Sequence, residues 1–203
     1  MNMKQRWGVL VATGALALGL AGCGASGGAT GNSAATTPAP APAVAKPIRA
    51  NLYLNVLTGK QDGKPGWPMF APADFTVPAN ALVTVQVRVW DDGTAPLAAN
   101  SPYAKVTGTV GGTATVVSNA TPNASPSTIT SLNPNAVSHT FTVTGLKLNV
   151  PLPVSSTVTF TFKTPAKPGT FTWACLAPCG SGANGMGGAM VTDGYMTGKM
   201  TVQ

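Results

Sequence analysis

The stretch Pro168-Gly-Thr-Phe-Thr-Trp-Ala-Cys175-Leu-Ala-Pro-Cys179-Gly180 lies near the end of the 203-residue chain. It opens on a Pro-Gly pair, which is typical of a turn, and continues with alternating large and small side chains. Phe171, Trp173 and Cys175 therefore fall on one face of a predicted strand, because successive side chains of a strand point to opposite faces. This strand runs into a pair of cysteines, so the stretch predicts a β-fold with a site at the end of its core.

The same alternation recurs along the chain, with Gly, Pro and Asn in the gaps and no helical period between the segments. The predicted strands are residues 51–57, 82–90, 106–110, 114–117, 139–143, 158–162, 171–175 and 200–202. Many short strands at fairly regular spacing predict an all-β sandwich or barrel. Residues 119–135, rich in Ser, Thr, Pro and Asn, are predicted to form a long loop.

The first residues have the pattern of a secretory signal over residues 1–22. Lys4 and Arg6 precede an apolar run of about a dozen residues, whereas a membrane-spanning helix needs roughly 20. Leu20-Ala-Gly-Cys23 follows and resembles the lipobox of bacterial lipoproteins, which implies cleavage before Cys23 and a membrane lipid on its sulfur. We therefore expect a chain that is lipid-anchored to the cell membrane on its extracytoplasmic face.

After Cys23 the composition changes twice. Residues 23–47 are rich in Gly, Ala and Pro, which predicts a disordered tether. The remaining residues, 48–203, are of the right length for one β-domain. The tether would give this domain reach above the membrane.

Charge and composition exclude several classes of function. The formal net charge is +7, and loss of Lys4 and Arg6 with the signal leaves ten basic and five acidic residues, or +5. These basic residues are scattered rather than clustered, so no nucleic-acid partner is expected. One histidine, five aspartates and no glutamate offer little for acid–base catalysis, and we expect no enzyme.

Soft ligand atoms gather around the two cysteines. If the strand that carries His139 neighbours the one that ends at Cys175, the two side chains meet at one end of the core. Cys179 comes next, and a glycine-rich stretch then carries Met186, with Met190 soon after. Sulfur ligands and one imidazole suit copper, especially Cu(I), better than they suit magnesium or calcium.

Each of these residues also has a structural interpretation. In an exported domain, Cys175 and Cys179 can form a disulfide instead of binding a metal. A lone histidine in an apolar strand, such as His139, is often a hydrogen-bonded core residue. Methionines such as Met186 and Met190 can fill irregular gaps in a core, and Met200, which alternates with Val202, is predicted to do so.

The ordering of these segments resembles that of the cupredoxins. Residues 168–202 resemble their last hairpin, and Ser138-His139-Thr-Phe-Thr-Val143 resembles the strand that brings their first histidine ligand. Asp74-Phe-Thr-Val-Pro-Ala-Asn80 resembles the usual start of such domains, so the resemblance covers about residues 48–203. It implies a Greek-key β-sandwich or barrel that binds copper and transfers electrons.

The Cys-x-x-x-Cys spacing is most similar to that of the copper A domain of cytochrome c oxidase subunit II. Cys175, Cys179 and Met186 match the two cysteines and the methionine of that loop, but Ala183 stands where the family has its second histidine. Since His139 is the only histidine, neither a full copper A site nor a blue-copper site with two histidines can be assembled from one chain.

Two functions follow from these residues. In the first, His139, Cys175, Cys179 and Met186 hold one copper ion, with Met190 as an alternative weak ligand. The protein then serves electron transfer or copper handling with a membrane-bound redox or copper-handling partner. In the second, the domain is a metal-free structural or interaction module that is closed by a Cys175–Cys179 disulfide.

Overall fold

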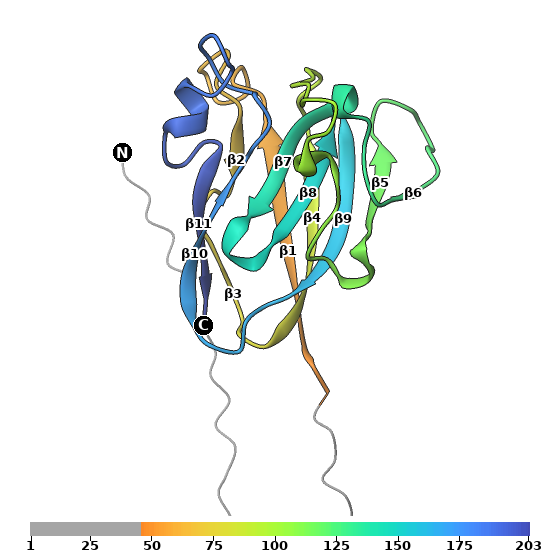
Figure 1. Ribbon diagram of the computed structural model, residues 1–203, viewed down its shortest axis with the longest axis vertical. Helices are drawn as coiled ribbons and strands as arrows, with labels where there is room; N and C mark the ends of the chain where they lie inside the picture. Colours follow the sequence, from red (N-terminus) through yellow and green to blue (C-terminus); the bar gives the residue numbers. More distant parts are fainter. Residues whose placement is uncertain (1–45) are drawn as a thin grey trace, which may run out of the picture. The chain divides into compact units, whose positions relative to one another are not determined.

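A computed structural model describes residues 46–203, which form two packed β-sheets (Figure 1). The first sheet has the strand order β2 (Met69–Ala71), β1 (Ile48–Leu57), β4 (Ala81–Val89), β9 (Ser156–Lys163), β5 (Ala114–Ser118), β6 (Ser127–Ile129). The second has the order β3 (Phe75–Val77), β11 (Thr197–Val202), β10 (Gly169–Ala174), β7 (Val137–Val143), β8 (Leu148–Pro153). The predicted all-β sandwich is confirmed.

The core lies between the two sheets and follows from the alternation in the sequence. In β4, Val83, Val85 and Val87 are fully buried, while the residues between them are more exposed. The core also contains an aromatic cluster, with Phe70 from the first sheet and Phe141 and Trp173 from the second. Trp173 stacks on Phe141 with ring centroids 5.9 Å apart and lies 4.6 Å from the ring of Phe70.

Strand β7 is buried on both faces, which is why polar residues within it need internal partners. Thr142 donates a hydrogen bond to Oδ1 of Asn149, and the Asn149 amide donates to the carbonyls of Tyr103 and Lys105. The short 3₁₀ turn Pro102–Ala104 therefore lies against β8 and covers this part of the second sheet.

Most predicted strands are present with shifted ends, but the predicted strand at 106–110 is wrong. Gly108 has a φ of +72°, and a Cβ there would meet the backbone of Leu148 at 2.7 Å. The segment instead runs across its neighbours and forms single bridges from Thr107 to Asn149 and from Thr109 to Phe162. The predicted loop at 119–135 is also partly wrong, because it contains β6.

Besides β6, three strands have no counterpart among the predicted ones. β2 and β3 have three residues each, too few for an alternation to show. β8 contains Pro151 and Pro153, which indicate a break when the sequence is considered by itself. It lies at the edge of its sheet, where the missing amide hydrogen of proline is tolerated.

The predicted signal, the lipid site at Cys23 and nearly all of the tether lie outside the described residues. The first strand of the described part of the chain, β1, begins at Ile48. Among residues 46–203, no helix is long and apolar enough to cross a membrane.

Candidate metal centre

The pairing of β10 with β7 brings the cysteine loop to the histidine strand. Ala174 of β10 is the antiparallel register partner of Thr142 in β7, so the chain that continues through Cys175 runs along β7 toward His139. The Cys175 sulfur accepts a hydrogen bond from the Thr140 amide at 3.4 Å, and the Cys175 amide donates to the carbonyl of Met196 at 2.8 Å. Cys175 is thus held between β7 and the chain that leads into β11.

Three of the predicted ligands form one cluster. The ligand atoms of His139, Cys175 and Cys179 all lie within 4.8 Å of one another, and no other cluster of at least three such side chains occurs in residues 46–203. The two sulfur atoms are 3.1 Å apart, and both cysteines are thiols. His139 and Cys175 are buried, while Cys179 is partly exposed. The expected meeting of His139 with Cys175 is confirmed.

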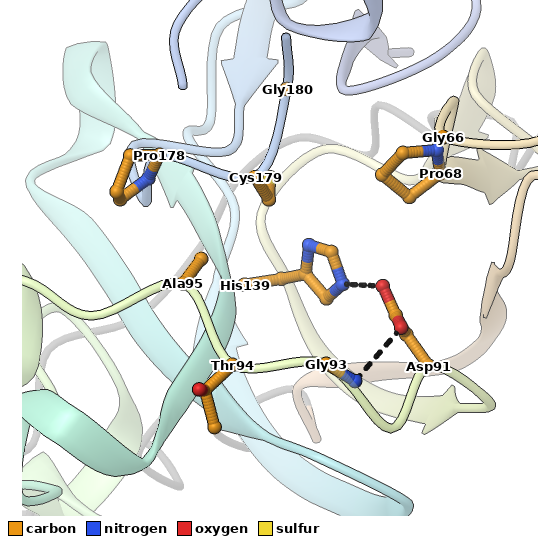
Figure 2. A pocket seen from close by; sticks show the side chains of 10 residues that line it. All are labelled: Gly66, Pro68, Asp91, Gly93, Thr94, Ala95, His139, Pro178, Cys179 and Gly180. Atoms are coloured by element: carbon orange, nitrogen blue, oxygen red, sulfur yellow. Dashed lines mark hydrogen bonds and ion pairs between the residues drawn. The ribbon is translucent and has the colours of Figure 1, made fainter. Parts of the chain in front are cut away.

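The imidazole of His139 is fully buried and its two nitrogens have different surroundings (Figure 2). Nε2 lies 3.0 Å from Oδ2 of Asp91, whereas Nδ1 has no hydrogen-bond partner among the described residues. Buried polar atoms are nearly always paired, so this unpaired ring nitrogen is suited to take a metal ion as its partner. A carboxylate on the outer nitrogen is the usual support of a histidine that binds metal through the other one.

Asp91 is itself held in place by its backbone surroundings. It follows β4, and its Oδ1 accepts a hydrogen bond from the amide of Gly93 at 3.0 Å (Figure 2). Its carbonyl accepts a hydrogen bond from the amide of Ser155 at 2.9 Å. The carboxylate therefore has one oxygen committed to its own turn and the other directed at His139.

Met190, rather than Met186, contacts the cluster. The sulfur of Met190 lies 3.2 Å from that of Cys179, and its residue is 8 % exposed. Met186 is 42 % exposed, and the methionine sulfur found in contact with a cysteine of the cluster, among residues 46–203, is that of Met190. Met200 is fully buried in the core, as predicted.

The glycine-rich loop explains why Met190 reaches the sulfur. The loop doubles back on itself, because Ser181 and Gly187 exchange backbone hydrogen bonds of 3.1 and 2.8 Å. A Cβ on Gly180 would lie 2.6 Å from Cγ of Met190, so only glycine leaves room for this methionine to pack there. The short turn Gly188–Val191 then places Met190 against Cys179.

The protonation of the cluster is shaped by its burial and by its internal contacts. Burial by itself would lower the pKa of His139, but the hydrogen bond to Asp91 and the nearby Cys175 sulfur outweigh it and raise that pKa to about 9. Burial opposes ionisation of Cys175, yet the hydrogen bond from Cys179 and the proximity of His139 hold the pKa of the Cys175 thiol well below its usual range. The same hydrogen bond, together with burial, raises the pKa of Cys179.

The donor set fits a copper ion. It contains two cysteine sulfurs, a thioether and one imidazole nitrogen, and soft sulfur donors select Cu(I). Zinc in proteins is held by cysteine, histidine and carboxylate ligands, and a thioether is not among them. His139, Cys175, Cys179 and Met190 are therefore consistent with copper.

A cavity of about 320 Å³, here called the Asp91 cavity, opens beside the cluster (Figure 2). Its lining residues are Gly66, Pro68, Asp91, Gly93, Thr94, Ala95, His139, Pro178, Cys179 and Gly180.

Asp91 is the residue of this site that the sequence did not indicate. The sequence offered one signal for it: the chain has only five acidic residues, so each of them is a candidate for a functional role.

No model of a known protein family and no curated protein matches the sequence. Among solved structures, auracyanin B is 16% identical, with 79% of this chain and 93% of that chain covered and a TM-score of 0.33. Reduced auracyanin from Roseiflexus castenholzii is 17% identical over 75% of this chain and 96% of that one, with a TM-score of 0.35. Rusticyanin from Thiobacillus ferrooxidans is 14% identical over 78% and 79%, with a TM-score of 0.34.

These similarities are too weak to say anything about the site. The chain itself shows the expected all-β sandwich, in which β7 lies beside the hairpin of β10 and β11 that flanks the cysteine loop.

Proposed function

We propose that the protein binds one copper ion, mainly as Cu(I), through His139, Cys175 and Cys179, with Met190 as a weaker fourth contact. The observation that carries this proposal is the buried Nδ1 of His139, which has no hydrogen-bond partner in residues 46–203, on an imidazole whose ligand nitrogen lies within 4.8 Å of both sulfurs. Because one imidazole stands among three sulfur donors, the set favours Cu(I) over Cu(II). Copper handling is therefore at least as well supported as electron transfer.

The location of this activity follows from the lipobox-like sequence. A lipid on Cys23 would anchor the domain to the extracytoplasmic face of the membrane, where a membrane-bound redox or copper-handling protein is its partner. Growth with a labelled fatty acid tests the anchor: the label should appear on the wild-type chain and be absent from Cys23→Ser. A wild-type chain without label would rule the anchor out.

A second candidate is a metal-free interaction module with a Cys175–Cys179 disulfide. It is supported by the 3.1 Å distance between the two sulfurs, from which a small movement reaches the bonding distance of about 2.05 Å. Thiol titration of metal-free protein, isolated without reductant, separates the two candidates. Reactive thiols at both positions support the copper site, and thiols that appear only after reduction support the module.

The copper proposal is tested by anaerobic reconstitution of the purified full chain with Cu(I). We expect about one bound ion per chain and an ultraviolet thiolate-to-copper charge-transfer band. Cys175→Ser should abolish both, because it removes the most buried sulfur of the set. Cys23→Ser is the matched control, since it changes a cysteine assigned to lipid and should leave both unchanged. Unaltered copper binding in Cys175→Ser would exclude the proposed site.

A further inference from the structure

The cluster meets its surroundings through one of its sulfurs. Cys175 is 1 % exposed and Met190 is 8 % exposed, and neither lines the Asp91 cavity. Cys179 is partly exposed and lines it together with His139. In Figure 2, Cys179 and Asp91 approach the His139 ring from two sides. A ligand in the cavity would therefore meet Cys179 before it could meet Cys175.

The lining of the cavity keeps this sulfur accessible. Three of its ten residues are glycines, Gly66, Gly93 and Gly180, and its largest side chain is that of His139, which is itself a ligand. At about 320 Å³ the cavity is at the lower end of the range of small-molecule sites, roughly 300 to 1,000 Å³. It can admit one donor side chain or a small thiol.

The charge of the cavity suits a cation. Asp91 is the only acidic residue in the lining, and its side chain is 21 % exposed. The lining contains no lysine or arginine, and its one histidine, His139, is neutral once it binds copper. A negative group in a partly buried recess attracts a cation more strongly than the same group in open water.

We propose that the Asp91 cavity is the route by which Cu(I) is exchanged, and that Cys179 takes the ion from an external thiolate that enters it. This inference rests on the proposed copper site. In the exchange, a bond from Cu(I) to the external sulfur breaks and a bond to the Cys179 sulfur forms. The proton of the Cys179 thiol passes to the released thiolate, and the copper stays in the Cu(I) state.

The test blocks the cavity without changing a ligand. Gly93 is exposed and lines the cavity. It has an ordinary φ, and a Cβ there would lie 3.4 Å from Oδ1 of Asp91, so Gly93→Leu adds bulk at a position that tolerates it. Its backbone bond to Asp91 is retained. Gly169→Leu is the matched control, because Gly169 is an exposed glycine of β10 where a Cβ meets only Phe171, at 3.9 Å.

Each protein is loaded with one stable isotope of Cu(I) and mixed with Cu(I)–glutathione of the other isotope, and the exchange is followed by native mass spectrometry. We expect the rate of isotope exchange in the wild-type protein to rise in proportion to the concentration of the Cu(I)–glutathione complex. Gly93→Leu, compared with the wild type when both are fully loaded with copper, should slow exchange about tenfold, a barrier increase of about 1.4 kcal/mol. Gly169→Leu should exchange at the wild-type rate.

Each result identifies what has failed. If the wild-type exchange rate does not depend on the concentration of the Cu(I)–glutathione complex, the route is overturned, because copper would then leave before another ligand arrives. This measurement needs no variant. Normal loading with wild-type exchange in Gly93→Leu also overturns the route and leaves the copper site standing. A wild-type chain that takes up no copper at equilibrium overturns the proposed function and the route together.

Discussion

Nε2 of His139 lies 3.0 Å from Oδ2 of Asp91, and this contact determines which ring nitrogen faces the two cysteines. The carboxylate cannot swing away freely, because its other oxygen accepts the Gly93 amide and its backbone carbonyl accepts the Ser155 amide. The contact therefore connects the turn after β4 to the histidine strand β7. Nδ1 is left as the nitrogen that can bind a metal.

The first prediction concerns the charge of that contact. In metal-free, reduced protein the pKa of His139 is raised to about 9, so Asp91→Asn should lower it toward the ordinary value of about 6.5. An asparagine keeps the shape of the side chain but removes the negative charge that stabilises the imidazolium. The chain has one histidine, so its ring-proton NMR signal can be titrated without assignment.

The neighbouring Asp92 provides the control. It is exposed, and Asp92→Asn removes the same charge one residue away. The His139 pKa in this variant should stay close to that of the wild type. If both variants lower the pKa equally, a general field rather than the hydrogen bond to Asp91 is responsible.

The second prediction distinguishes the two methionines. Met190→Leu removes the thioether that lies 3.2 Å from the Cys179 sulfur, and it should weaken Cu(I) binding about tenfold, or about 1.4 kcal/mol. Met186→Leu is the same change on an exposed side chain and should have no effect. Competition against a coloured Cu(I) chelator measures both affinities. If Met186→Leu weakens Cu(I) binding and Met190→Leu does not, the methionine ligand is Met186, as the copper A resemblance implies.

The third prediction concerns Thr140, which holds the cysteine loop to β7. Its hydroxyl oxygen accepts the Leu176 amide at 2.7 Å, and its own hydrogen goes to Thr142, whose hydrogen is already donated to Asn149. Thr140→Val leaves the Leu176 amide without this acceptor, which should lower the free energy of unfolding by about 1 to 3 kcal/mol. Urea denaturation of the metal-free protein measures the change.

The control for Thr140 is Thr159 in β9. It is partly exposed, and no side-chain hydrogen bond of Thr159 is found in the described part of the chain. Thr159→Val should change stability by less than about 0.5 kcal/mol. Equal losses in the two variants would mean that the polar chain through Thr140 adds nothing to the fold.

The predictable part of the site consists of residues whose pattern is local. His139 and Cys175 each belong to a strand with clear alternation, and Cys179 follows at a short spacing, so their meeting needed only the two strands to be neighbours. Asp91 and Met190 depend instead on how loops fold. The turn at Gly93 directs the carboxylate, and the reversal at Gly180 brings Met190 in place of Met186.

The strands also divide into those with a local sequence pattern, which could be predicted, and those that depend on distant contacts, which could not. β4 and β9 were predictable because every second residue is apolar. The strand β8 was not, because its prolines have the local signature of a turn and only its position at a sheet edge makes them acceptable. Segment 106–110 has the alternation of a strand, but the close approach of Gly108 to Leu148 depends on a contact far away in the sequence.

The last prediction concerns proton release when copper binds. Below a pH of about 9 the metal-free His139 keeps the proton that copper must displace, because its pKa is raised to about that value. The pKa of Cys179 is raised, so its thiol also gives up a proton, whereas that of Cys175 is lowered and its thiolate has none to give. At neutral pH, each Cu(I) should therefore release one proton from His139 and one from Cys179.

The sign of the pH dependence follows from these protons. Each unit of pH below about 9 should weaken apparent affinity about tenfold through His139 alone, and this contribution should disappear as the pH rises through about 9. Calorimetry in buffers of different ionisation enthalpy counts the protons. In Asp91→Asn the loss of the His139 proton should shift to lower pH, while the Cys179 proton is still released at neutral pH. Copper binding at neutral pH without proton release would show that neither His139 nor Cys179 is a ligand.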